Sequence, residues 1–220
     1  MKTKNIFLTV ALALCTTFAF AQNITGSKHD FRVQSFNPTS GGSAEICITC
    51  HTPHNAISSA NGAPLWNHAE SVETFTPYAD NGTLDASVAA PTGTSKLCLS
   101  CHDGTTNLDA IGTGVAGTAA LGSATFYPTT TADLGTNLTT HHPVSFTYDD
   151  ALAAADGGLH PPTSTTSGIT GNIDADMLFG AGNDRLECSS CHDVHNGANL
   201  AGLLVKTNNG SALCLTCHNK

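Results

Sequence analysis

Two cysteines and two histidines share eight consecutive residues near the start of the chain, Cys47-Ile48-Thr49-Cys50-His51-Thr52-Pro53-His54. Two cysteines three positions apart, followed directly by a histidine, form the attachment signature of a c-type haem. The two thiols are close enough to add to the two vinyl groups of one porphyrin, and the adjacent imidazole is carried over the iron as its proximal ligand. The signature recurs as Cys98–His102, Cys188–His192 and Cys214–His218. The sequence therefore predicts four covalently bound haems.

The four copies assign a role to twelve side chains. The thiols predicted to bind haem are those of Cys47, Cys50, Cys98, Cys101, Cys188, Cys191, Cys214 and Cys217. The predicted proximal iron ligands are His51, His102, His192 and His218. The ninth cysteine, Cys15, lies in the apolar N-terminal segment, so no thiol remains for a disulfide.

Two other uses of paired cysteines fit the pattern less well. Eight thiolates could hold two zinc ions with four ligands each. A thioredoxin-like redox site needs a single CxxC motif on a strand–helix unit. Neither explains why a histidine follows the second cysteine in all four copies.

Residues 1–21 have the pattern of a cleaved signal peptide. Lys2 and Lys4 form a basic start, residues 6–20 form an apolar run, and Ala19-Phe20-Ala21 supplies the small residues of a cleavage site. The run is too short for a stable membrane span. We therefore expect a secreted protein in which residues 22–220 form a single tetrahaem domain, in agreement with haem attachment outside the cytoplasmic membrane.

The charge balance is acidic, with a formal net charge of −9. Cleavage after Ala21 would leave six Lys and Arg residues against seventeen Asp and Glu residues. This balance argues against nucleic acid as a partner, because nucleic-acid binding requires the opposite sign. It favours cationic partners or metal ions.

Regular structure is expected to be scarce. The chain holds 21 glycines and nine prolines, and its aliphatic residues are scattered rather than periodic. The exceptions are residues 141–148, which alternate like a short strand, and residues 149–156, which could form two helical turns with acidic residues at their start. We predict a mostly irregular fold of loops with short helices and few short strands, wrapped around four stacked haems.

Four haem irons have eight axial positions, so four distal ligands are needed. Met177 is the only methionine after residue 21, which makes bis-histidine ligation the default. His54 and His195 each follow a proximal histidine by three residues. Neither can fold back over its own haem, but each can reach the iron of a haem stacked beside it. The spacing thus predicts closely paired haems.

The remaining histidines differ in their promise as ligands. His142 precedes Pro143, which would hold it rigidly, and it is favoured over its neighbour His141. His29 lies in a polar segment and could be a distal ligand or a solvated loop residue. His68 could pack beside Trp66 or bind a haem propionate, and His160 resembles a loop residue.

Several short elements extend the pattern beyond the haem motifs. In chain order they are SKHDF, CxxCHTPHNA, PLWN, CLSCHDGT, HPVSFTYD, CSSCHDVHN, LL and CLTCHNK. In this order they resemble the doubled-CxxCH multihaem cytochromes, and most of all the tetrahaem extracellular cytochromes that polymerise into conductive filaments (OmcE-type). The resemblance runs from His29 to Lys220, although residues 112–135 and 161–182 match nothing in that family.

The resemblance implies a ligand set and an assembly. Family members have distal ligands at the positions of His29, His54, His142 and His195, whereas the position of His68 is often arginine. Filament-forming relatives take one distal histidine from the adjacent subunit. For this chain the resemblance implies a homopolymer in which His29 is the candidate that crosses over.

A full set of eight histidine ligands leaves no iron open to a substrate, so we expect an electron carrier rather than an enzyme. One hypothesis is an extracellular polymer that passes respiratory electrons to redox proteins or metal oxides. A second is a monomeric periplasmic shuttle. A third, a haem enzyme such as a nitrogen-oxide reductase, requires one distal candidate to be a non-ligand. Only 11% of the residues are charged, which suits a large subunit contact better than free diffusion.

Overall fold

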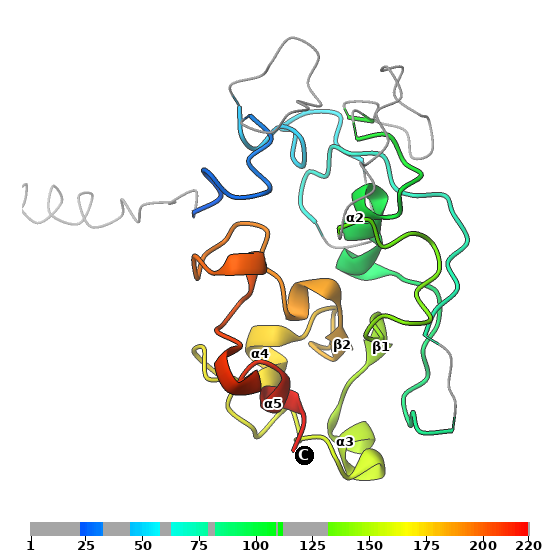
Figure 1. Ribbon diagram of the computed structural model, residues 1–220, viewed down its shortest axis with the longest axis vertical. Helices are drawn as coiled ribbons and strands as arrows, with labels where there is room; N and C mark the ends of the chain where they lie inside the picture. Colours follow the sequence, from blue (N-terminus) through cyan, green and yellow to red (C-terminus); the bar gives the residue numbers. More distant parts are fainter. Residues whose placement is uncertain are drawn as a thin grey trace, which may run out of the picture.

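The computed structural model describes residues 23–32, 45–57, 63–78, 82–108, 110–111 and 132–219. The predicted signal peptide, residues 1–21, lies outside these ranges. The described residues are mostly loops and turns, with regular structure in short pieces (Figure 1). In chain order these are α2 (Gly93–His102), β1 (Phe146–Thr147), α3 (Asp150–Asp156), α4 (Ile173–Met177), β2 (Arg185–Leu186), the 3₁₀ turns η1 (Cys188–Ser190), η2 (Ala201–Leu203) and η3 (Asn209–Ser211), and α5 (Cys214–Cys217).

The strand predicted over residues 141–148 is confirmed only at Phe146 and Thr147. Strand β1 pairs antiparallel with β2, with Phe146 opposite Leu186 and Thr147 opposite Arg185. Ser145 has a φ of 60°, which turns the chain out of the extended conformation just before the strand begins. This backbone turn, which the alternation of side chains does not reveal, shortens the strand.

The two helical turns predicted over residues 149–156 are confirmed by α3. The side chain of Asp149 caps the helix, because its Oδ1 accepts a hydrogen bond of 2.8 Å from the backbone N–H of Leu152. The helix ends at Gly157, where φ is 68°. Glycine adopts this left-handed conformation without strain and is the usual residue after a helix end.

The apolar core of the described residues is divided into small clusters, each of which contacts a haem motif. Helices α3 and α4 and strands β1 and β2 contribute to one cluster, which packs against Cys191 and Cys217. Ile57, Trp66 and Leu97 form a second cluster beside Cys50. A third contains Leu99, which lies within the second haem motif. The apolar side chains therefore pack in separate clusters around the haem motifs and do not form one central core in the described residues.

Segments far apart in the chain meet at the haem motifs. Residues 23–32 lie beside the segment that follows η1 (blue and orange in Figure 1), and the side-chain amide of Asn196 donates to the carbonyl of Asn23 over 3.1 Å. Across the described ranges, no helix is both long enough and apolar enough to cross a membrane. The wrapping of the chain around four stacked haems stays a prediction.

Candidate haem-binding sites

Each haem motif folds into a single turn of chain. The second motif ends helix α2, the fourth is helix α5, and the third begins with η1. In the first, third and fourth motifs the backbone N–H of the histidine donates to the carbonyl of the first cysteine, over 2.8, 3.0 and 3.0 Å. This turn brings both thiols and the imidazole together, which is the arrangement that two thioether bonds and a proximal ligand require.

Backbone carbonyls orient three of the proximal histidines. The Nδ1 atoms of His51, His102 and His192 lie 2.8, 2.7 and 2.8 Å from the carbonyl oxygens of Pro64, Ala132 and Gly202. A carbonyl can only accept, so Nδ1 carries the proton in each ring. Nε2 is then the unprotonated nitrogen, which is the usual arrangement for an imidazole that binds a metal.

Three of the proximal histidines face a histidine from a distant segment. The ring centroids of His51 and His195 are 6.3 Å apart, and the rings are within 10° of parallel. Those of His29 and His102 are 6.1 Å apart. Those of His142 and His218 are 6.3 Å apart. Each pair joins a predicted proximal ligand to a predicted distal ligand.

These separations fit an iron atom held between two imidazoles. A ligating nitrogen lies about 2 Å from its metal, and each ring centre lies roughly 1 Å beyond it, so opposed ring centres are about 6 Å apart. The three measured separations have this value. The chemistry and the spacing of the donors therefore fit haem iron with two histidine ligands.

His29 is the most buried of the distal candidates. Desolvation by the surrounding protein, together with the neighbouring His102, His192 and His195, lowers its pKa to about 4. Its Nδ1 is a buried atom without a hydrogen-bond partner among the described residues. The low pKa keeps the imidazole neutral, which is the form that binds a metal. His29 faces His102 of its own chain.

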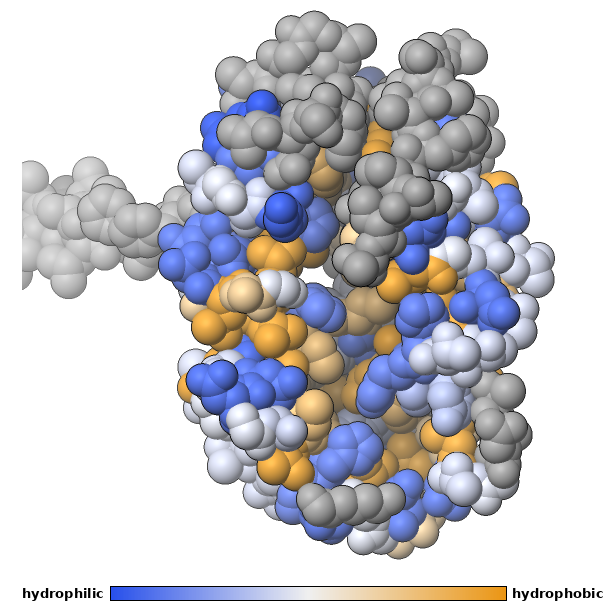
Figure 2. Space-filling view, viewed as in Figure 1, coloured by the Kyte–Doolittle hydropathy of each residue, from blue (hydrophilic) through white to orange (hydrophobic). Residues whose placement is uncertain are grey.

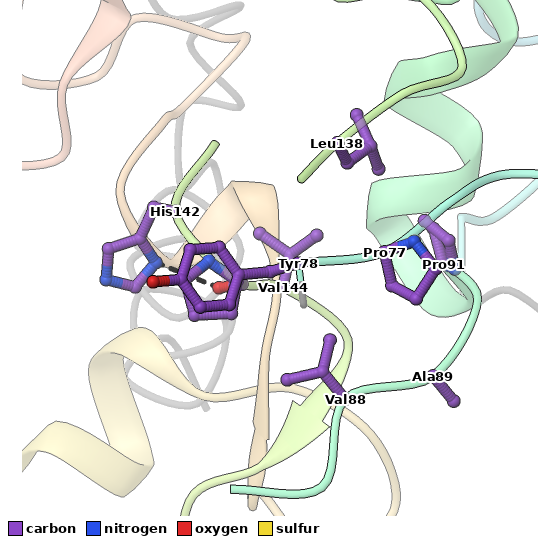
Figure 3. Close-up of a pocket in the computed structure, with 9 residues that line it drawn as sticks. Pro77, Tyr78, Val88, Ala89, Pro91, Leu138, His142 and Val144 are labelled. Atoms are coloured by element: carbon purple, nitrogen blue, oxygen red, sulfur yellow. Dashed lines mark hydrogen bonds between the residues drawn. The ribbon is translucent and has the colours of Figure 1, made fainter. Parts of the chain in front are cut away.

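His142 is held by its neighbours in the way that Pro143 led us to expect. Its Nδ1 lies 2.8 Å from the carbonyl oxygen of Pro143, and the ring stands at an apolar hollow beside Tyr78 and Val144 (Figure 3). His141, the alternative, makes no ring contact among the described residues. The hollow is lined by Pro77, Tyr78, Val88, Ala89, Pro91, Leu138, His142, Pro143 and Val144.

The remaining distal and proximal candidates, His54 and His192, are not brought together. His54 and His192 are both exposed, and within the described ranges His54 makes no ring contact. The main chain of His54 is fixed by a hydrogen bond of 2.9 Å from the Thr52 hydroxyl to its carbonyl. His192 keeps its bond to Gly202.

The surroundings of the histidine pairs suit a porphyrin. Apolar side chains gather along the walls of a hollow that runs through the middle of the face in Figure 2. Val194, two residues after the third motif, and Leu215, inside the fourth, are 38% and 45% exposed. Trp66 has a buried Nε1–H without an acceptor in the part of the chain that the structure describes, and a haem propionate would satisfy this donor.

The other histidines and the methionine occupy different settings. His68 is buried, with Nδ1 2.8 Å from the Ala69 carbonyl oxygen and Nε2 3.6 Å from the thiol sulfur of Cys101. It thus lies beside the second cysteine of the second motif. His160 makes its contacts through its main chain, to Cys217 and Tyr148. Met177 is 2% exposed and packs in the apolar cluster around α4.

Among the described residues the eight cysteines of the motifs are free thiols. Burial raises the pKa of Cys50 and of Cys101 to about 12, because the thiolate would lose its hydration. The zinc interpretation requires four thiolates around one ion. Among the described residues no three His, Cys, Asp or Glu side chains are grouped to hold a metal ion by themselves.

Two kinds of group near the haem motifs were not predicted from the sequence. The carbonyls that orient the proximal rings, those of Pro64, Ala132 and Gly202, have no side-chain signature. Glu187 was also missed, although it lies one residue before the third motif and is 2% exposed. A carboxylate directly before a haem motif was the one available signal, and by itself it does not distinguish a buried residue from an exposed one.

The comparison with known proteins supports the haem assignment. Residues 181–220 match the model of the family described as the doubled CXXCH motif, a stretch that holds the third and fourth motifs. A search among curated proteins found no match. The match over residues 181–220, together with the facing histidine pairs, supports covalently bound haem c of the kind found in multihaem c-type cytochromes.

Proposed function

We propose that the protein is a tetrahaem c-type cytochrome that carries electrons and catalyses no reaction of its own. The observation that carries this proposal is the set of three histidine pairs with ring centres 6.1–6.3 Å apart. The proposed axial ligands are His51 with His195, His102 with His29, His192 with His54, and His218 with His142.

The protein's own residues have three tasks in this function. When bound, the haems supply irons that exchange single electrons. The carbonyls of Pro64, Ala132 and Gly202 hold the proximal rings in the ligating tautomer. The distal histidines fill the second axial position and keep substrates away from it. Two histidines per iron favour a low reduction potential, which burial and nearby acidic groups adjust further.

We propose further that the subunits polymerise into an extracellular filament, which passes electrons to redox proteins or metal oxides. The resemblance of the short elements to filament-forming cytochromes and the low fraction of charged residues support this assembly. A monomeric periplasmic shuttle is the alternative. Because His29 faces His102 of its own chain, a bridging role for His29 requires residues 23–32 to be exchanged between neighbouring subunits, as in domain swapping.

Negative-stain electron microscopy of the haem protein, purified without denaturant from the growth medium and from the periplasm, tests the assembly. Filaments a few nanometres wide in the medium are the expected result. Uniform small particles confined to the periplasm would favour the shuttle. High-spin haem in the absorption spectrum of the same sample would point to an open iron and to the enzyme alternative.

A further inference from the structure

We propose that the buried carboxylate of Glu187 places a negative charge between the second and third haem motifs. This charge lowers the reduction potentials of the haems attached at these two motifs. The inference rests on the proposed electron-carrying function and adds a determinant of the potentials. Glu187 lies between strand β2 and turn η1, directly before Cys188.

Hydrogen-bond donors from three segments converge on the Glu187 carboxylate. Its Oε2 accepts from the backbone N–H of Ser95 over 3.2 Å, from the hydroxyl of Ser95 over 2.5 Å and from the hydroxyl of Ser145 over 2.8 Å. The side chain also accepts from the backbone N–H of Ser190 in a capping box. A site made of donors suits an ionised carboxylate, which can only accept.

The backbone on the other side of the carboxylate is also adapted to it. Gly93 has a φ of 53°, and a Cβ atom at this position would lie 2.6 Å from Oε1 of Glu187. Any side chain here would therefore both strain the backbone and displace the carboxylate. The first residue of α2 leaves room for the acidic group.

No cation neutralises this charge within the described part of the chain. The ion pairs among the described residues are Arg32 with Asp30, Lys96 with Glu70, and His195 with Asp193, and none of them includes Glu187. Arg185, two residues from Glu187, instead donates to the carbonyl of Ser145. The carboxylate is thus stabilised by hydrogen bonds rather than by an ion pair, so its negative charge remains to act on neighbouring groups.

The groups closest to the Glu187 carboxylate belong to the second and third haem motifs. The backbone N–H of Cys188 donates to the Ser95 hydroxyl over 2.9 Å, and the hydroxyls of Thr94 and Ser189 are 2.5 Å apart. The thiols of Cys98 and Cys188 lie close enough to influence each other electrostatically. Glu187 therefore stands where the first thioether of the second haem meets the first thioether of the third.

The sign of the effect follows from electrostatics. Reduction adds an electron to the haem, and a fixed negative charge in a poorly hydrated setting opposes it. Because Glu187 is shared by two motifs, its charge should lower both potentials in the same direction. The first and fourth haems, attached at other segments, should be affected less.

The test compares haem potentials in the full-length holoprotein by spectroelectrochemical titration. Glu187→Gln keeps the shape but removes the charge, and it should raise two of the four potentials. Glu187→Asp keeps the charge and should leave both near their original values. Glu73→Gln is the control, because it removes the same charge from an exposed side chain where water screens it. A Gln variant that shifts no more than this control would overturn the proposal, as would equal shifts in the Asp and Gln variants.

If the Gln variant is recovered without haem, Ser145→Ala provides a second test, with an expected shift of opposite sign. It removes a hydroxyl dipole that stabilises the carboxylate, so two potentials should fall, and unchanged potentials would contradict the proposal. Haem count and spin state are measured on the same samples. They test the proposed function separately, because the change in haem potential caused by a Glu187 variant can be measured even if one iron is high-spin.

Discussion

The imidazoles of His51 and His195 lie 6.3 Å apart and almost parallel, although they belong to the first and third haem motifs. His195 follows His192, the proposed proximal ligand of the third motif, by three residues, so in the proposed ligand set this segment would supply ligands to two different haems. An arrangement of this kind ties two haems to each other through the protein. It is the basis of our first prediction.

Replacing His195 by alanine should convert one of four irons from the low-spin to the high-spin state. The haem of the first motif would keep His51 and lose its second strong ligand. Electron paramagnetic resonance of the oxidised protein measures this change. His160→Ala is the matched control, because His160 makes its contacts through its main chain. An unchanged spectrum in the His195→Ala protein would exclude this ligand pair.

The His29→Ala variant separates an intrachain ligand from one exchanged between subunits. In both cases the protein should keep its four haems and show one high-spin iron, since attachment depends on cysteines. If the segment is exchanged, filaments should be lost as well, because the ligand is also the link. Electron microscopy and spin counting on one preparation give both readings. Four low-spin irons in this variant would show that His29 is no ligand.

The apolar cluster around α4 should account for a large share of the stability of the C-terminal half. Ile173 has no exposed surface and packs in the cluster that supports Cys191 and Cys217. Ile173→Ala should lower the free energy of unfolding by about 2–5 kcal/mol, measured by urea titration. Ile169→Ala, at a side chain that is 40% exposed, should change it by no more than about 0.5 kcal/mol. Equal effects at the two positions would contradict this packing.

The carboxylate of Asp176 should make stability depend on pH. Hydrogen bonds from the Ser167 hydroxyl and from the backbone N–H groups of Gly171 and Thr170 hold its pKa well below the usual value. A lowered pKa stabilises the fold above about pH 4, and this contribution disappears as the pH falls through the lowered value.

Asp176→Asn should therefore lower the urea midpoint at pH 7, and the deficit should narrow steadily below pH 4. Asp174→Asn removes a charge from the same helix and serves as the control. A deficit of equal size at pH 7 and pH 3 would mean that the carboxylate's ionisation contributes nothing.

What could be predicted from the sequence was the chemistry that side-chain types carry locally. The turn at each CxxCH motif and the helix capped by Asp149 depend on neighbours a few residues away. The strand was predicted too long, because the positive φ of Ser145 is not visible in a pattern of alternating side chains.

What could not be predicted were contacts between distant loops. The approach of His29 to His102 and the convergence of Ser95 and Ser145 on Glu187 bring together segments without any periodic pattern. In a chain with little regular structure, no register links one segment to another. Such contacts are set by the packing of the whole molecule.

The most direct test of the account is quantitative electron paramagnetic resonance of the oxidised protein, calibrated against the number of haems per chain. We predict four haems, all low-spin, with signals of two histidine ligands at every iron. Fewer than four haems, or a high-spin iron that binds added ligands, would contradict the assignment of a bis-histidine electron carrier.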